Sequence, residues 1–101
     1  MAIRKVIGVV ESKGNFNGTD YRNLVLHTTY TDQYVIGEKV EQYKAKWSNL
    51  DEVFALGLSD SEIENLDASS FSDLVGKTVK LYADRFKVLD RVFVPEESKS
   101  K

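Results

Sequence analysis

The stretch Val40-Glu-Gln-Tyr-Lys-Ala-Lys-Trp47 decides between a mainly β fold and a mixed one. Its apolar and polar residues alternate as in a strand with one buried face: Tyr43, Ala45 and Trp47 share one side, and Gln42, Lys44 and Lys46 share the other. Val40, Tyr43 and Trp47 also fit the 3.6-residue period, so a helix is the alternative. We favour a strand that turns its apolar side inward and both lysines outward.

The chain before this stretch predicts two further strands. Residues 3–10 are rich in Ile and Val, and residues 21–30 place Leu24 and Leu26 on one face, which we expect to point inward. Residues 11–20 contain two glycines, two asparagines and an aspartate, so we expect a long hairpin loop there. After a polar break at residues 31–33, the third strand is expected to start at Tyr34 and to bulge or bend at Gly37.

Short helices are predicted after Trp47. Ser48 or Asn49 can cap a helix that runs to Leu56 and ends at Gly57. Capping-box spacings follow at residues 59–62 and 70–73. We expect a helical insert over residues 48–76 that packs through five apolar side chains: Leu50, Phe54, Ile63, Leu66 and Phe71.

Strand character returns over residues 77–94. Val79 and Leu81 should point inward, and Lys80 and Tyr82 outward. A hairpin turn near residues 84–87 has no Gly or Asn, so its type stays open.

The predicted order of three strands, a helical connection and two strands is that of a five-stranded OB-like barrel. Four stretches carry a family resemblance: Gly14-Asn-Phe-Asn-Gly-Thr-Asp-Tyr-Arg-Asn-Leu-Val-Leu-His27, Gly37-Glu-Lys-Val-Glu-Gln-Tyr-Lys-Ala-Lys46, Leu74-Val-Gly-Lys77 and Tyr82-Ala-Asp-Arg-Phe86. In these stretches the chain resembles the small OB-fold proteins of bacteriophages and conjugative elements, some of which are similar to single-stranded-DNA-binding proteins. Lys87 departs from this resemblance, because a glycine is expected in such a hairpin.

The length and composition limit the function classes. We expect one domain at residues 1–95 of the 101 and a disordered tail at residues 96–101. The chain has no run of about 18 apolar residues, which a membrane span needs, so no membrane role is expected. There is no cysteine, which excludes disulfides and thiolate sites and favours a cytoplasmic location. With His27 as the only histidine, we expect no enzyme, metal or cofactor.

Charge is segregated along the chain. Residues 48–76 contain seven acidic and no basic residues, whereas the other 72 carry 14 basic and nine acidic ones. A solvated helical face explains the acidic insert; the alternative is that the insert recruits a protein partner, as an inhibitor or adaptor would.

Single strands are bound without sequence preference by aromatic rings that stack on bases and by cations along the phosphates. The candidate residues for binding single-stranded DNA or RNA are Phe16, Tyr21, Arg22, Lys44, Lys46, Tyr82, Arg85, Phe86 and Lys87. The structural alternative is that these aromatics form the rim of the core and that the lysines provide solubility. Edge strands of an open barrel also allow a homodimer.

Overall fold

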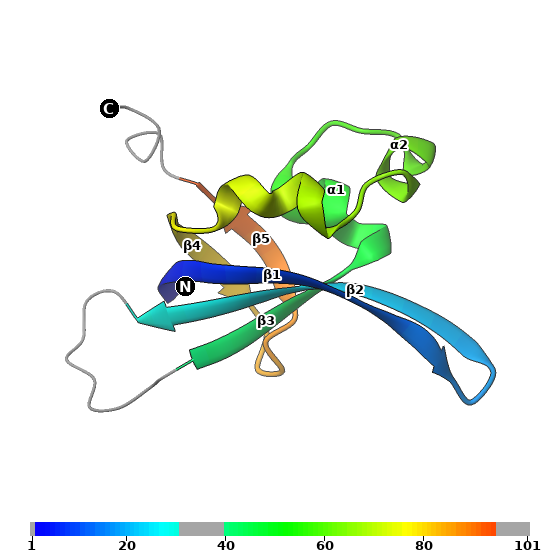
Figure 1. The fold of residues 1–101 in the computed structure, drawn as a ribbon, viewed down its shortest axis with the longest axis horizontal. Coiled ribbons are helices and arrows are strands. Elements are labelled where there is room, and N and C mark those ends of the chain that lie inside the picture. Colours follow the sequence, from blue (N-terminus) through cyan, green and yellow to red (C-terminus); the bar gives the residue numbers. More distant parts are fainter. Residues whose placement is uncertain (1, 31–39, 95–101) are drawn as a thin grey trace.

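The computed structural model describes residues 2–30 and 40–94, which form five strands and four short helices (Figure 1). The strands are β1 (Ala2–Phe16), β2 (Thr19–Tyr30), β3 (Val40–Lys46), β4 (Thr78–Ala83) and β5 (Leu89–Phe93). The helices, all between β3 and β4, are η1 (Trp47–Asn49), α1 (Leu50–Phe54), α2 (Asp60–Glu64) and η2 (Ala68–Leu74), where η marks a 3-10 helix. The protein is therefore mainly β, with a short helical insert. The expectations for residues 31–39 and 95–101 lie outside the described residues.

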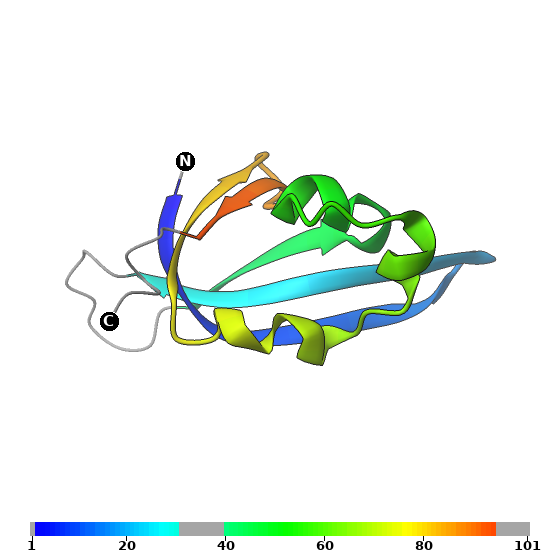
Figure 2. The same ribbon diagram turned by 90° about the horizontal axis from the view of Figure 1, so that it is seen from above.

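The strands form one antiparallel sheet in the order β3-β2-β1-β4-β5. The sheet curls so that its two edge strands approach each other (Figure 2). An isolated parallel bridge joins Lys44 to Val88 there, and the Lys44 N–H donates to the Lys87 carbonyl oxygen at 3.0 Å. Within the described ranges no continuous ladder links β3 to β5, so the sheet is not closed into a barrel.

The alternation of β3 is confirmed, because residues 40–46 form a strand and not a helix. Tyr43 and Ala45 are buried, and Trp47 is buried as the first residue of η1. The inward residues predicted on the other strands are buried too: Leu24, Leu26, Val79 and Leu81. Because one face of each strand is packed, a period of two identifies it.

The long loop predicted over residues 11–20 is wrong. β1 and β2 continue through it and are joined by the two-residue turn Asn17-Gly18, with φ of 53° and 80°. An Asn-Gly turn with both φ values positive matches the right-handed twist of a hairpin. The Asn15 side chain accepts from the Gly18 N–H at 3.2 Å and donates to Asp20 at 2.8 Å, which fixes the turn. The polar residues of this segment therefore lie on exposed strands of the hairpin and not in a loop.

The helical insert covers one face of the curled sheet (Figure 1). Its buried side chains join the core with those of the strands: Leu50, Val53, Ile63, Phe71 and Leu74. Phe54 and Leu66, also expected inside, are partly buried against this core. None of the helices in residues 2–30 and 40–94 has the length and apolar character needed to cross a bilayer.

The helix caps differ in part from the prediction. The box at residues 59–62 is present, with the Ser59 hydroxyl and the Glu62 side chain both in place. The second box lies three residues earlier than predicted, because Asp67 is the N-cap and Ser70 completes it. α1 has no side-chain cap, and its C-cap is Ala55 in the left-handed region at φ 52°.

Asp84 builds the turn between β4 and β5, whose type the sequence left open. Its carboxylate accepts the N–H groups of Phe86 at 2.8 Å and Val88 at 3.0 Å. Lys87 occupies the left-handed region at φ 62°, where a glycine is usual. The two hydrogen bonds to Asp84 therefore stabilise a turn in which Lys87, a residue other than glycine, takes the left-handed conformation.

Candidate functional site

The outward face of the sheet differs sharply in charge from the inward face. Register and burial place five cations at outward positions: Lys5, Lys44, Lys46, Lys80 and Arg91. The acidic residues of the described strands all have inward positions, except Asp90, which lies at the β5 bulge. Glu11 and Glu41 lie on the inward side and are paired, with Arg22 at 2.7 Å and Arg4 at 3.0 Å. This face therefore presents cations with few competing anions.

A groove lies on this outward face between the hairpin and β3. It consists of two adjoining hollows of about 510 and 450 Å³, and we call it the β2–β3 groove. The lining residues that carry its chemistry are Phe16, Tyr21, Lys44 and Lys46, with Thr19, Asn23 and Val88 between them. Phe16 is 70% exposed and Tyr21 44% exposed, so both rings are accessible. Asp20 borders the second hollow, together with Arg22 and Ser48.

The Tyr21 ring is positioned by the residue opposite it. Tyr21 pairs with Gly14 across the hairpin. A Cβ atom at Gly14 would lie 2.8 Å from the Tyr21 hydroxyl oxygen and 3.0 Å from Cζ. The ring therefore covers Gly14, and a Cβ atom at this position would force the Tyr21 ring to shift.

The β4–β5 turn borders the groove through Val88. At its tip Arg85 and Phe86 are exposed, with the Arg85 guanidinium carbon 5.0 Å from the centre of the Phe86 ring. Lys87 is already partnered, since its ammonium group lies 3.7 Å from Glu41 and 6.0 Å from the Tyr43 ring centre. Only Val88 of this turn lines the groove, and Arg85 lines a separate hollow with Tyr43 and Leu81.

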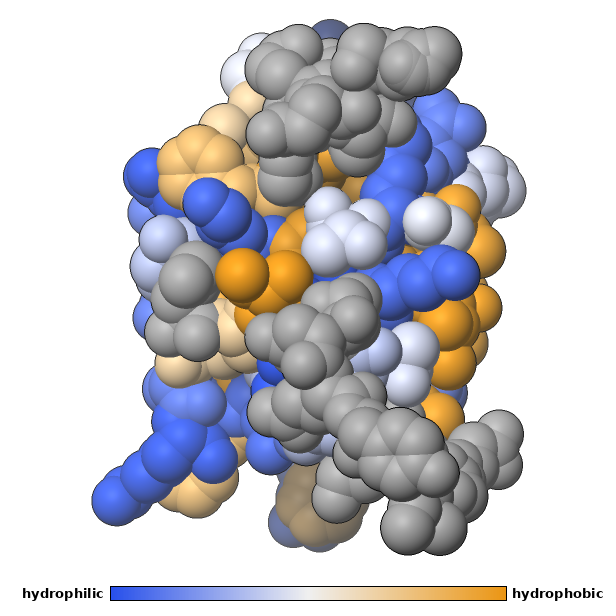
Figure 3. Space-filling view, turned by 90° about the vertical axis from the view of Figure 1, so that its left-hand side faces the viewer, coloured by the Kyte–Doolittle hydropathy of each residue, from blue (hydrophilic) through white to orange (hydrophobic). Residues whose placement is uncertain are grey.

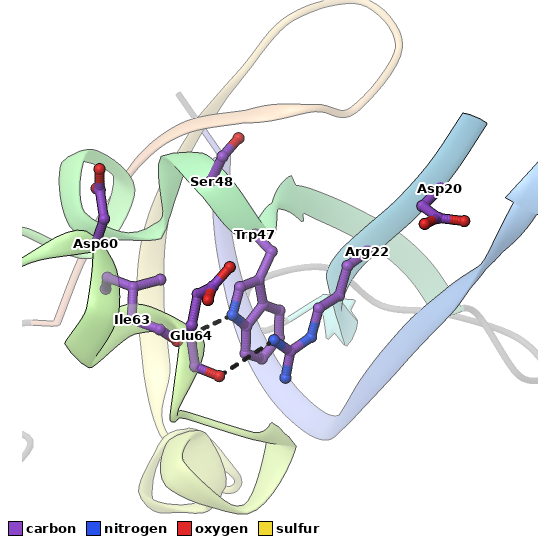
Figure 4. Close-up of a pocket in the computed structure, with 7 residues that line it drawn as sticks. All are labelled: Asp20, Arg22, Trp47, Ser48, Asp60, Ile63 and Glu64. Carbon is purple, nitrogen blue, oxygen red and sulfur yellow. Dashed lines mark hydrogen bonds between the residues drawn. The ribbon is translucent and has the colours of Figure 1, made fainter.

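Arg22 performs a structural role on the inward side. Its guanidinium carbon lies 3.7 Å from the Trp47 ring centre, and it donates to Glu11 and to the Leu66 carbonyl at 2.7 and 2.9 Å. Figure 4 shows it beside Trp47, with a further hydrogen bond to the Glu64 carbonyl at 3.4 Å. The sequence analysis offered Arg22 as a nucleic-acid contact; its alternation with Leu24 on β2 is the signal that could have placed it inward.

Tyr82 lies away from the groove, on the outward face of β4. It pairs with Arg91 of β5, and its ring centre is 6.4 Å from that of Phe93. The strand order separates β4 from β2 by β1. The predicted residues therefore divide into the groove, its bordering turn, the inward Arg22 and the separate Tyr82.

Glu41 organises a polar cluster behind β3. Burial alone would raise its pKa, but the hydrogen bond from Arg4 and the charges of Arg4 and Lys87 hold the pKa below its usual value. Burial and the Glu41 charge raise the pKa of Tyr43, whose hydroxyl donates to Glu41 at 3.2 Å. This carboxylate therefore stays ionised and is balanced by cations.

Within the described part of the chain, no group of three or more histidine or acidic side chains is placed to hold a metal ion. Comparisons with protein-family models, with curated proteins and with solved structures gave no match to this chain. The assignment of function therefore rests on the residues and their geometry.

Proposed function

We propose that this chain is a non-catalytic protein that binds single-stranded nucleic acid in the β2–β3 groove. The observation that carries the proposal is the composition of the outward face, where aromatic rings and cations gather and carboxylates are nearly absent. A polyanion with stacking bases is the ligand that such a surface complements.

The proposal includes an OB-like barrel of the kind found in phages and mobile elements. Three observations support it: the strand order, the approach of β3 to the start of β5, and the position of the insert between β3 and β4. OB-folds bind oligonucleotides across the strand 2–3 face, between the loops that join strands 1–2 and 4–5. The groove lies between the corresponding hairpin and turn.

The net charge of −2 does not oppose this function. Six of the seven carboxylates of the insert lie in helices that cover the other face of the sheet, and Asp67 caps one of these helices (Figure 1). Charges farther apart than about 8–10 Å are largely screened at physiological salt. Lys44 and Lys46 line the groove itself, whereas Asp60 and Glu64 of the insert line a neighbouring hollow that shares Asp20, Arg22 and Ser48 with it. We expect the two lysines to dominate the field that a phosphate chain meets inside the groove.

A titration of fluorescein-labelled dT16, followed by anisotropy at 50 and 200 mM salt, tests the proposal. Tyr21→Ala should weaken binding by about 5- to 150-fold, which corresponds to about 1–3 kcal/mol for one stacked base, without changing the salt dependence. Tyr21→Phe, which keeps the ring, should bind like the wild type. Failure of the wild type to bind dT16 at 50 mM salt would overturn the proposal.

The lysines should show the complementary behaviour. Lys44→Gln with Lys46→Gln should weaken binding and lower the log–log salt slope by about 0.7 for each lost phosphate contact. Lys13→Gln is the matched control, because Lys13 is exposed on the opposite face of the same hairpin, 3.9 Å from Glu11. A parallel titration with rU16 separates a preference for DNA from one for RNA.

A protein partner at the insert is the second candidate function. It is favoured by the exposure of Glu52, Asp60, Glu62, Glu64, Asp67 and Asp73, none of which forms an ion pair within the described ranges. Two results together would favour this candidate. The protein would not bind dT16, and it would bind polylysine equally well before and after substitution of the groove residues.

A further inference from the structure

A second group of aromatic and cationic side chains lies on the outward face of β4 and β5. It consists of Lys80, Tyr82, Arg91 and Phe93, and we call it the β4–β5 surface. Lys80 pairs with Phe93 across the strands, and Tyr82 pairs with Arg91. The Arg91 guanidinium carbon lies 5.8 Å from the Phe93 ring centre, and the Tyr82 and Phe93 rings meet edge to face.

These rings remain accessible although they touch each other. Tyr82 is 40% exposed and Phe93 49% exposed, and Ile3 beside them on β1 is 36% exposed. Figure 3, which looks at the end of the molecule away from the hairpin tip, shows hydrophobic residues directly beside hydrophilic ones on its described surface. Rings that served only the core would be covered, as Trp47 and Phe71 are.

The β4–β5 surface and the β2–β3 groove share none of their residues. On β1, Gly14 faces Tyr21 of the groove, whereas Ile3 faces Lys80. These eleven residues correspond to at most about 36 Å of strand, at about 3.3 Å per residue. The two surfaces therefore contact opposite ends of β1, although the sheet curls so that Val88, just before β5, lines the groove as well.

We propose that the β4–β5 surface is a second binding site for single-stranded nucleic acid. A base would stack on Tyr82 or Phe93, and Lys80 and Arg91 would bind the neighbouring phosphates. Charge complementarity selects this ligand, since two cations flank the rings and Asp90 at the bulge is the one nearby strand carboxylate among the described residues. The inference uses the chemistry of the proposed function but does not depend on the groove.

Two separated sites change how ligand length affects binding. A short strand of about four nucleotides, the lower limit for one OB-fold, can occupy each site separately. A longer strand that reaches both sites gains from the effective concentration of its second half. We therefore expect two dT4 molecules but one dT16 per protein.

Amide chemical shifts of the ¹⁵N-labelled protein, followed by NMR during titration with dT4 and dT16, test the inference. Shifts should appear both at Tyr21 and Lys46 and at residues 80–82 and 91–93. Lys80→Gln with Arg91→Gln should abolish the second set, reduce the dT4 stoichiometry from two to one and leave the groove shifts intact. Lys13→Gln should change neither set.

The outcomes separate the two proposals. Shifts confined to the groove would overturn the second site and leave the proposed function standing. Shifts confined to residues 80–82 and 91–93 would refute the groove, and no shifts would refute both. Unchanged stoichiometry in the Lys80→Gln, Arg91→Gln variant, with an intact spectrum, would also overturn the second site.

Discussion

The guanidinium carbon of Arg22 lies 3.7 Å from the centre of the Trp47 ring, and both side chains donate to backbone carbonyls of the same insert. Arg22 donates to Leu66, and the Trp47 indole donates to Ile63 at 3.0 Å. The pair therefore joins the base of the hairpin, the end of β3 and the helices into one unit.

Replacing Arg22 should destabilise the fold more than it affects ligand binding. Arg22→Met loses hydrogen bonds made by a charged group and leaves the partly buried Glu11 with only the more distant Lys13, which should cost about 2 kcal/mol. Urea unfolding followed by Trp47 fluorescence measures this loss. Arg85→Met, at an exposed turn, should stay within about 0.5 kcal/mol of the wild type. Full stability of Arg22→Met, combined with lost dT16 binding, would instead make Arg22 a ligand contact.

Gly14→Ala should weaken dT16 binding through the displaced ring of Tyr21. The new methyl group would occupy the space where the Tyr21 ring lies, so the stacking platform must tilt. We expect a loss of up to about 1 kcal/mol, a part of what one stacked base contributes. Gly8→Ala is the control on the same strand, since a Cβ there would meet its nearest neighbour at an ordinary 3.7 Å.

A double variant makes the Gly14 test specific. Once Tyr21 is alanine, Gly14→Ala should have no further effect on binding, because the ring that it displaces is gone. Additive losses in this cycle would show that Gly14 acts through the backbone of the hairpin.

Glu41 should make stability depend on pH in the acid range. Its pKa is lower in the folded protein than the value of about 4.3 for a free glutamate, so its contribution is present above that pH and is lost as the pH falls through the folded value. Glu41→Gln should therefore destabilise the protein at pH 7 and destabilise it less at about pH 3. Urea midpoints at both pH values measure this, and Glu52→Gln on the exposed side of α1 controls for net charge. An equal loss at both pH values would contradict the expectation.

Replacing residues 48–76 by a Gly-Ser link should unfold the domain. Five side chains of the insert are buried in the shared core, and each contributes roughly 1.5–3 kcal/mol, against a net stability of about 5–15 kcal/mol for a typical domain. Loss of the cooperative transition and a red shift of the Trp47 emission would follow. A shortened protein as stable as the parent would make the insert an appendage and strengthen the case for a protein partner there.

The strands with one packed face were predictable from the sequence, whereas the continuation of β1 and β2 through residues 11–20 was not. The alternating positions of Leu24 and Leu26 predicted that both side chains are buried, and both are. In residues 11–20 the turn-forming composition outweighed the more specific signal, which is the Asn17-Gly18 dipeptide. A ribbon exposed on both faces has no hydrophobic alternation to reveal it.

The groove was partly predictable for the same reason. Tyr21, Lys44 and Lys46 follow from alternation on β2 and β3, and the register brings them together. The contacts of Arg22 with the carbonyls of residues 64 and 66 join segments more than 40 residues apart, which no local pattern reveals. The separation of Tyr82 from the groove follows from the strand order, which also depends on tertiary packing.

From the Ser12–Asn23 pair to its tip, the hairpin is a ribbon of only two strands, because the pairing of β2 with β3 stops at Asn23 and Lys46. Such ribbons are marginally stable without a third strand or a packed face, so this segment opens at a lower free energy than the core. Phe16, the most exposed large apolar side chain of the described residues, sits near its tip. Because this ribbon is held mainly by its own two-strand pairing, any conformational freedom that it has in the free protein must be lost when Phe16 packs against a ligand, and that loss lowers the affinity.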